Sequence, residues 1–190
     1  MSAQDRPRRE YPSAKHEGSP MSAQDRPRRE YRSAKHEGRP MSTRQFWIGV
    51  VSKDHVDRAT AGGFAQVSHG KAGPLERMRA GDGFAYYSPR TSYPDGAPLQ
   101  AFTAIGRVRT GVVYQAEMED GFRPFRLDVD FLAAKPAPVK PLLPELTFIR
   151  SKTHWGAAFR FGVVRIPEAD FAVIAAAMKR SFEADFPSIS

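Results

Sequence analysis

A glycine-rich stretch with a lysine, a serine and a histidine raises the first chemical hypothesis. Residues 63–74 read GFAQVSHGKAGP. A phosphate-binding Walker loop needs a glycine, four residues, Gly-Lys and then Ser or Thr. Counted from the pair Gly70-Lys71, the first glycine is replaced by Ala65 and the hydroxyl residue by Ala72. The pattern therefore fails twice and argues against a nucleotide triphosphatase.

A serine and a histidine suggest hydrolysis as a second chemistry. A hydrolase would use His69 with Ser88, and Asp82 would complete the residue types of a triad. The chain lacks the G-x-S-x-G elbow that presents a nucleophilic serine in many hydrolases. Because any chain of this length contains these residue types, a small-molecule hydrolase is the alternative and a binding protein is the first expectation.

Carboxylates and imidazoles give no other catalytic or metal-binding pattern. Asp128 and Asp130 share one face of a predicted strand, which favours a solvated polar face over a pair of catalytic acids. His55, His69 and His154 lack ligand spacing such as H-x3-H, and the chain has no cysteine. We therefore expect no catalytic residue, no metal and no cofactor.

Aromatic residues beside basic or amide residues point instead to binding. Trp155 lies in RSKTHWGAAFR, residues 150–160, which holds three basic residues, Arg150, Lys152 and Arg160, besides the histidine. Tyr87 is followed three positions later by Arg90. An aromatic face flanked by Arg and Lys can stack a base while the cations hold its phosphate. The residues of this kind are Trp47, Tyr87, Phe102 and Trp155.

Charge and composition favour a polyanionic partner. The 190 residues carry 29 Lys and Arg against 21 Asp and Glu, a formal net charge of +8, with a sequence pI near 10.0. Such an excess favours nucleic acid as the partner. No apolar run is long enough for a membrane helix, and the N-terminus has no apolar signal core. These features predict a cytoplasmic protein without membrane contact, with a monomer favoured.

The first forty residues are two copies of one 20-residue unit. Residues 1–20 read MSAQDRPRREYPSAKHEGSP, and residues 21–40 differ only by Arg32 and Arg39. The unit is charged and has no periodic apolar face, so it cannot bury enough apolar area to offset its ordering entropy. We predict a disordered basic leader over residues 1–43. It is either a solvated segment without a role or an arm attracted to phosphates.

The elements that must position these residues follow from apolar patterning. Strands are predicted at residues 46–51, 84–88, 99–113, 125–131 and 159–166, and helices at residues 54–63, 74–83 and 167–182. Residues 92–98 contain a Pro-Asp-Gly turn, and residues 135–146, with four prolines, form a covering loop. The strand at 125–131 is the clearest, because apolar and polar residues alternate along it.

Three details sharpen these expectations. Asp54 is expected to cap the first helix, and the strand 99–113 to bend at Gly106 or Gly111. The last helix presents an apolar face made of Phe171, Ile174, Ala175, Met178 and Phe182. Strands and helices do not alternate as in βαβ units, so we predict an α+β fold. Its core would be a mixed or antiparallel β-barrel flanked by short helices and a C-terminal helix.

Several blocks of the sequence resemble one known family. WIGVVSKDHV, GFAQVSHGKAGPLERM, GDGFAYYSP, LQAFTAIGRV, PFRLDVDF and WGAAFRFG occur in this order between Phe46 and Met178. This pattern resembles the bacterial EVE-domain family, also called the UPF0310 group. The resemblance implies a PUA-like fold, related to YTH and ASCH domains, over residues 44–186. It also implies a non-catalytic module that binds nucleic acid through a modified base.

The resemblance further implies where the base would bind. The pocket would lie between the end of the first strand, the loop after the first helix and the next strand. Base-binding residues would be Trp47, Ser52, Lys53, Gln66, Val67, Ser68, His69, Tyr87, Ser88 and Trp155, and phosphate-binding residues Lys71, Arg90 and Arg160. An adenine or a cytosine, in DNA or RNA, remains open as the modified base. A protein-interaction adaptor stays a third hypothesis.

Overall fold

The structure is a computed structural model that describes residues 29–30, 44–118, 121–179 and 185. The predicted leader lies outside these residues except for Arg29–Glu30, strand β1, which pairs with strand β5. Phe182 of the predicted last helix also lies outside them. No helix of the described part is long and apolar enough to cross a membrane.

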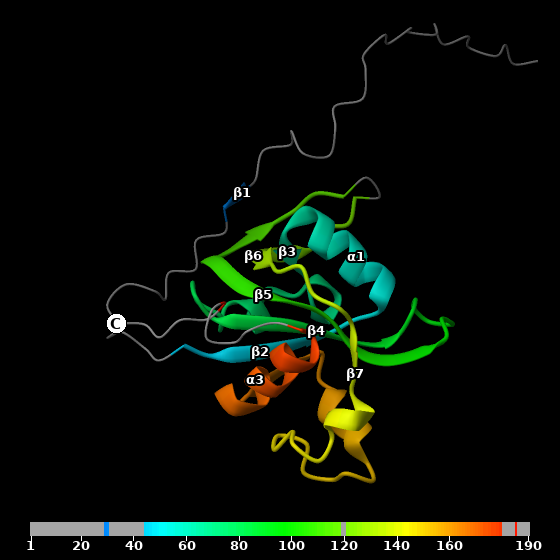
Figure 1. Cartoon of the computed structure of the whole chain (residues 1–190). Helices are drawn as coiled ribbons and strands as arrows, with labels where there is room; N and C mark the ends of the chain where they lie inside the picture. The colour runs from blue at the N-terminus through cyan, green and yellow to red at the C-terminus, as the bar shows by residue number, and fades with distance from the viewer. Residues whose placement is uncertain (1–28, 31–43, 119–120, 180–184, 186–190) are drawn as a thin grey trace, which may run out of the picture.

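Among the described residues, eight strands form one mixed sheet (Figure 1). Six strands pair in the order β3 (Phe64–Ala65), β6 (Phe125–Phe131), β5 (Pro98–Gln115), β4 (Gly83–Arg90), β2 (Phe46–Val50) and β8 (Val163–Ile166). The two short strands β1 and β7 (Ala137–Pro138) each pair with β5. Only β2 and β4 run parallel within this set. The α+β class and the mixed sheet are confirmed. The strand order is open at β3 and β8 instead of closing into a barrel.

Short helices flank this sheet. The α-helices are α1 (Lys53–Gly62), α2 (Ala72–Leu75) and α3 (Glu168–Ala177), and the 3-10 helices are η1 (Ser68–Gly70), η2 (Lys140–Leu142) and η3 (Trp155–Phe159). Helix α1 ends as predicted at a glycine, since Gly63 takes the left-handed conformation with φ of 66°. The expected cap is wrong: the N-cap residue is Ser52, and Asp54 lies inside the first turn.

Apolar side chains on both faces explain why the first strand reads as an unbroken apolar run. In β2, Phe46 and Ile48 belong to one core cluster, and Trp47 belongs to the cluster on the other face. Helix α3 covers the first face, with Phe171 packed on Phe46 at a ring-centroid distance of 4.9 Å, and α1 covers the second with Val56 (Figure 1). A strand covered on both sides needs no polar face.

Strand β5 bends where the sequence predicts. Gly111 has a φ of 67°, and the register between β5 and β6 shifts between Val108 and Val113. A Cβ on Gly111 would lie 2.8 Å from the backbone nitrogen of Ala80, so the bend also brings a neighbouring loop close. Glycine at this position therefore meets both a conformational and a steric requirement.

Two predicted elements are wrong. The helix expected at residues 74–83 ends at Leu75, because the chain then turns so that Gly81 N–H donates to Val108 O at 2.9 Å. The strand expected at residues 159–166 starts only at Val163. Its first half includes the end of η3, where Gly156 and two alanines allow a tight helix.

Asp128 also departs from expectation. The predicted solvated face of β6 holds for Asp130, which is exposed and pairs with Arg109. Asp128 is only 7% exposed, because β3 pairs with β6 at that position, Phe64 opposite Asp128. Strand β3, a short strand that residue propensities do not predict, therefore covers Asp128 on the polar face of β6.

A buried carboxylate fixes the segment that leads to η3. Asp170 of α3 is 1% exposed and accepts hydrogen bonds from the backbone nitrogens of Thr147 at 3.0 Å and Phe148 at 2.7 Å, and from the Thr147 hydroxyl. These bonds tie residues 147–148 to α3 before the chain reaches η3.

We predict that Asp170→Ala lowers the free energy of unfolding by about 2–3 kcal/mol, because hydrogen bonds to a charged acceptor contribute about that much. Urea denaturation measures the change. Glu168→Ala, which removes an exposed acid two residues earlier in the same helix, serves as control and should cost less than about 1 kcal/mol. Equal losses in both variants would contradict the assigned role of Asp170.

Candidate nucleic-acid interface

The carboxyl end of β2 joins β4, another predicted wall of the site, to the turn that precedes β8. Val51 N–H donates to Tyr87 O of β4 at 3.2 Å, and Val50 N–H donates to Gly162 O at 2.8 Å. Residues 161–163 form a tight turn, named here the Gly162 turn, in which Val163 N–H donates to Phe161 O at 2.6 Å and Gly162 has a φ of 66°. One strand end thus fixes both β4 and the turn before β8.

The loop over residues 66–71, named here the η1 loop, has an uncommon backbone. Ser68, His69 and Gly70 all have positive φ values, of 50°, 56° and 77°. Non-glycine residues rarely adopt this conformation, and strained backbone tends to gather at binding sites and ligand clamps. The stretch that fails as a Walker loop is therefore a left-handed turn.

Gln66 anchors the start of this loop. Its backbone nitrogen donates to the Tyr86 hydroxyl at 2.9 Å, and its carbonyl oxygen accepts from that hydroxyl at 3.2 Å and contacts His55 Nε2 at 3.1 Å. Burial lowers the pKa of His55, so its neutral ring donates this bond. The Gln66 side-chain oxygen accepts from Arg126 Nε at 3.0 Å. Gln66 thus holds the loop, and its amide oxygen is already engaged.

Two glycines let the η1 loop pack closely. A Cβ on Gly162 would lie 2.7 Å from Ser68 Oγ, so the loop touches the Gly162 turn. A Cβ on Gly70 would lie 2.7 Å from Pro124 Cβ on the other side. The loop is therefore clamped between two segments that are distant in sequence, and Ser68 and Gly162 belong to one surface.

The contact joins two stretches that carry no acid. No Asp or Glu occurs between Asp57 and Glu76, nor between Glu145 and Glu168. The basic residues of these stretches are Arg58, Lys71, Arg150, Lys152, Arg160 and Arg165, with His69 and His154. Lys71, His69 and Arg160 are exposed. Residues 150–162, named here the η3 segment, thus add positive charge to that of the η1 loop.

An aromatic cluster centres on Phe159 of the η3 segment. Tyr87 stacks on Phe159 with ring centroids 3.9 Å apart and 16° between planes. Trp155, half-buried, meets Phe159 edge-on at 6.3 Å, and Phe102 and Phe148 also contact it edge-on. Trp155 and Tyr87, two of the predicted aromatics, therefore lie in one cluster, bridged by a phenylalanine that the sequence places inside a strand.

The Tyr87 hydroxyl is unusual within this cluster. The residue is only 2% exposed, and its hydroxyl has no hydrogen-bond partner among the residues that the structure describes. Burial alone raises the pKa of Tyr87 to about 12. The hydroxyl oxygen is not among the buried side-chain atoms that lack a hydrogen bond, so it reaches the surface and is open to water or to a ligand.

Trp47 does not present a ring to a base, which corrects the prediction. It is 4% exposed, its indole Nε1 donates to Asp82 Oδ2 at 2.9 Å, and Arg77 lies 5.2 Å from its ring centroid. Trp47 points to the face of β2 opposite Tyr87 and packs in the core. Val67 is buried in the same cluster.

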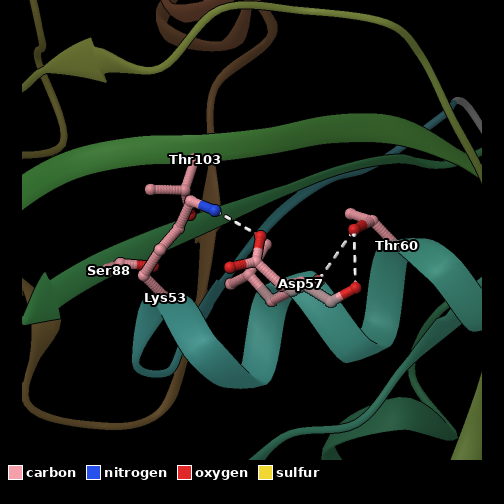
Figure 2. A network of polar contacts seen from close by, with 6 residues as sticks. Lys53, Asp57, Thr60, Ser88 and Thr103 are labelled. Atoms are coloured by element: carbon pink, nitrogen blue, oxygen red, sulfur yellow. Dashed lines mark hydrogen bonds and ion pairs between the residues drawn. The ribbon is translucent and has the colours of Figure 1, made fainter. Parts of the chain in front are cut away.

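Ser88, like Trp47, is buried inside the protein (Figure 2). It is fully buried, and its hydroxyl pairs with the Thr103 hydroxyl at 2.8 Å on the neighbouring strand. A serine nucleophile needs a base within hydrogen-bond reach, and the partner seen here is a threonine instead of His69. Within the described residues, no group of three or more His, Asp or Glu side chains could hold a metal ion.

The remaining predicted residues lie around the start of α1 and after β4. Lys53, half-buried like Ser52, is hydrogen-bonded to Asp57 one turn along α1, and Figure 2 shows its amine directed along the helix. Arg90 is exposed and donates to the Gly96 carbonyl at 2.9 Å. The charges of Lys53 and Arg90 are thus partly engaged within the protein.

Phe159 and Phe161 were missed by sequence reasoning. Both fall inside the predicted strand 159–166, where alternation would place them on one face. In the structure Phe159 is buried, whereas Phe161 is 81% exposed. Gly162 is the signal that could have separated them, since a glycine within a strand pattern often marks a bulge or a turn.

Adjacent tyrosines give a matched test of the unpartnered hydroxyl. Tyr86→Phe should lower the free energy of unfolding by about 1–3 kcal/mol, because it leaves the buried Gln66 N–H without its partner, whereas the Gln66 carbonyl keeps its contact with His55. Tyr87→Phe should leave this free energy unchanged or raise it, since no partner among the described residues loses a bond. Thermal and urea unfolding of both variants measure the difference. A loss as large in Tyr87→Phe would show that its hydroxyl has a structural partner.

Comparison with known proteins places the whole of this region in one family. The EVE domain family matches residues 45–177, and this span contains every element from β2 to α3. UPF0310 proteins of Mycolicibacterium vanbaalenii and Mesorhizobium japonicum are each 52% identical over 132 and 135 residues, and one of Bacillus subtilis is 46% identical over 133. Each match covers 70% of this chain and 91% of the relative. The chain therefore belongs to the EVE domain family, and the sequence resemblance is confirmed.

Proposed function

We propose that this protein is a non-catalytic module that binds a nucleobase of DNA or RNA, preferentially a modified one, between the η1 loop and the η3 segment. The observation that carries the proposal is the contact between Ser68 and the Gly162 turn. It joins two basic stretches without acids, and Phe159 of the η3 segment stacks on Tyr87, whose hydroxyl has no partner among the described residues. Positive charge, aromatic rings and a hydroxyl that is available as a hydrogen-bond donor are together what a base and its phosphate require.

The aromatic cluster supplies the base contacts in this proposal. Trp155 is a half-buried ring of the cluster, and stacking a base on an aromatic side chain contributes about 1–3 kcal/mol. The Tyr87 hydroxyl donates a hydrogen bond to a ring nitrogen or carbonyl oxygen of the base. A base that lacks an acceptor at this place forgoes that hydrogen bond and binds less well.

Lys71 and Arg160 supply the phosphate contacts. Both are exposed, and neither has an ion-pair partner among the described residues. Lys53 pairs with Asp57, so it contributes less. Two available cations imply a modest affinity that falls as salt rises, because binding releases counterions from the phosphates.

The hydrolase hypothesis has no such support. Its nucleophile, Ser88, is fully buried and hydrogen-bonded to Thr103, and His69 lies exposed on the η1 loop. A binding role uses the exposed imidazole and lysine of that loop without requiring a reactive serine.

The test compares single-stranded oligonucleotides with one methylated adenine or cytosine against their unmodified twins, over a salt series. We expect tighter binding of one modified strand. Lys71→Ala and Arg160→Ala should each weaken both strands and lower the slope of log K against log salt by about 1. Lys135→Ala is the control, because this exposed lysine lies near α3, which packs at the opposite end of β2. Equal affinity for every modified strand and its twin would refute recognition of a modified base, and an unchanged slope would refute the phosphate contacts.

A further inference from the structure

Phe161 is the most exposed large hydrophobic residue among those that the structure describes, at 81%. A single exposed apolar side chain is ordinary on a protein surface. Its backbone is the reason to consider it further. Phe161 lies in the Gly162 turn, which is fixed to the end of β2 by the bond from Val50 N–H to Gly162 O.

The turn holds the ring in a defined place. The bond from Val163 N–H to Phe161 O closes a three-residue turn around Gly162, whose positive φ a side chain would strain. The next residues enter β8, and Ser68 packs against Gly162 from the η1 loop. A phenyl ring on such a fixed backbone loses little conformational entropy when something stacks on it.

The surroundings of the ring are cationic. Arg160 precedes it and is exposed, and His69, next to Ser68 in the η1 loop, is exposed as well. The chain has no acid between Glu145 and Glu168. A protein partner would need a broader apolar surface than one ring beside an arginine and a histidine. Charge complementarity and the isolated ring favour a polyanion with flat groups, which is a nucleic acid strand.

We infer that Phe161 stacks a nucleotide adjacent to the base held near Tyr87, so that the protein binds a single strand across the Gly162 turn and the η1 loop. This inference rests on the proposed function and adds the substrate class to it. A single strand is required because a stacked duplex has no free base face for an outside ring, whereas an unpaired nucleotide has one. Arg160 then lies beside the phosphate that links the two nucleotides.

The experiment uses the full chain and three probes that share one methylated nucleoside, chosen as the best ligand in a thermal-shift panel of methylated adenosines and cytidines. The probes are the free nucleoside, a seven-nucleotide single strand with that nucleoside at its centre, and the same strand annealed to its complement. Deoxyribose and ribose versions of the strand separate DNA from RNA. Phe161→Ala, Phe161→Trp and Tyr93→Ala are compared with the wild type, and Tyr93 is a matched control because it is 80% exposed on a different loop.

Phe161→Ala should weaken single-strand binding by about tenfold, leave nucleoside affinity within about twofold, and keep the unfolding temperature of the wild type. Phe161→Trp should retain strand affinity, and Tyr93→Ala should change nothing. A wild type that binds no methylated nucleoside overturns the proposed function, and this inference with it. Nucleoside binding by the wild type, together with unchanged strand affinity in Phe161→Ala or a duplex bound as tightly as the strand, overturns only the role of Phe161.

Discussion

The missing side chain at Gly49 is the constraint on which the candidate site depends. A Cβ at this position of β2 would lie 2.8 Å from the ring of Phe84 and 2.9 Å from Val67 Cγ1. Any side chain would therefore push away the sheet's own core or the start of the η1 loop. Val50, the next residue, carries the hydrogen bond to Gly162. Both loops of the site thus take their positions from two consecutive residues at one strand end.

Close packing explains how a left-handed loop persists there. Residues such as Ser68 and His69 in this conformation cost about 1–3 kcal/mol each, and they persist only where the surrounding structure over-determines them. The Tyr86 hydroxyl bonds to both backbone groups of Gln66, and Arg126 bonds to its side chain. Hydrogen bonds inside a dry core are electrostatically stronger than those in water. A buried polar anchor therefore offsets strain that is exposed at the surface.

The parts of the fold that were predictable from sequence are those set by local periodicity. Alternation along β6 and the apolar run of β2 identify strands because each reports its own burial, and Gly111 marks the bend of β5. The η3 segment was not predictable in the same way. Phe159 and Phe161 have equal hydrophobicity and the spacing of a strand face, and only the turn at Gly162 sends one inside and one outside.

The residues of the candidate site were also only partly predictable from sequence. Tyr87 and Trp155 were identified from their basic neighbours, and they do lie in one cluster, but Trp47 met that criterion too and packs in the core. The face of the sheet decides between them, and neighbours in sequence do not report it. Tyr87 and Trp47 lie on opposite faces, as do Tyr87 and Tyr86.

Tyr86 and Tyr87 show most clearly how the two faces of the sheet differ. Both are buried side by side in β4, and burial raises the pKa of each, but only the Tyr86 hydroxyl bonds to the described part of the protein. For folding alone, a phenylalanine in place of Tyr87 would fill nearly the same volume, and no described group would lose a hydrogen bond. The Tyr87 hydroxyl, which no described group binds, is therefore the polar atom of the cluster that the proposed ligand would engage.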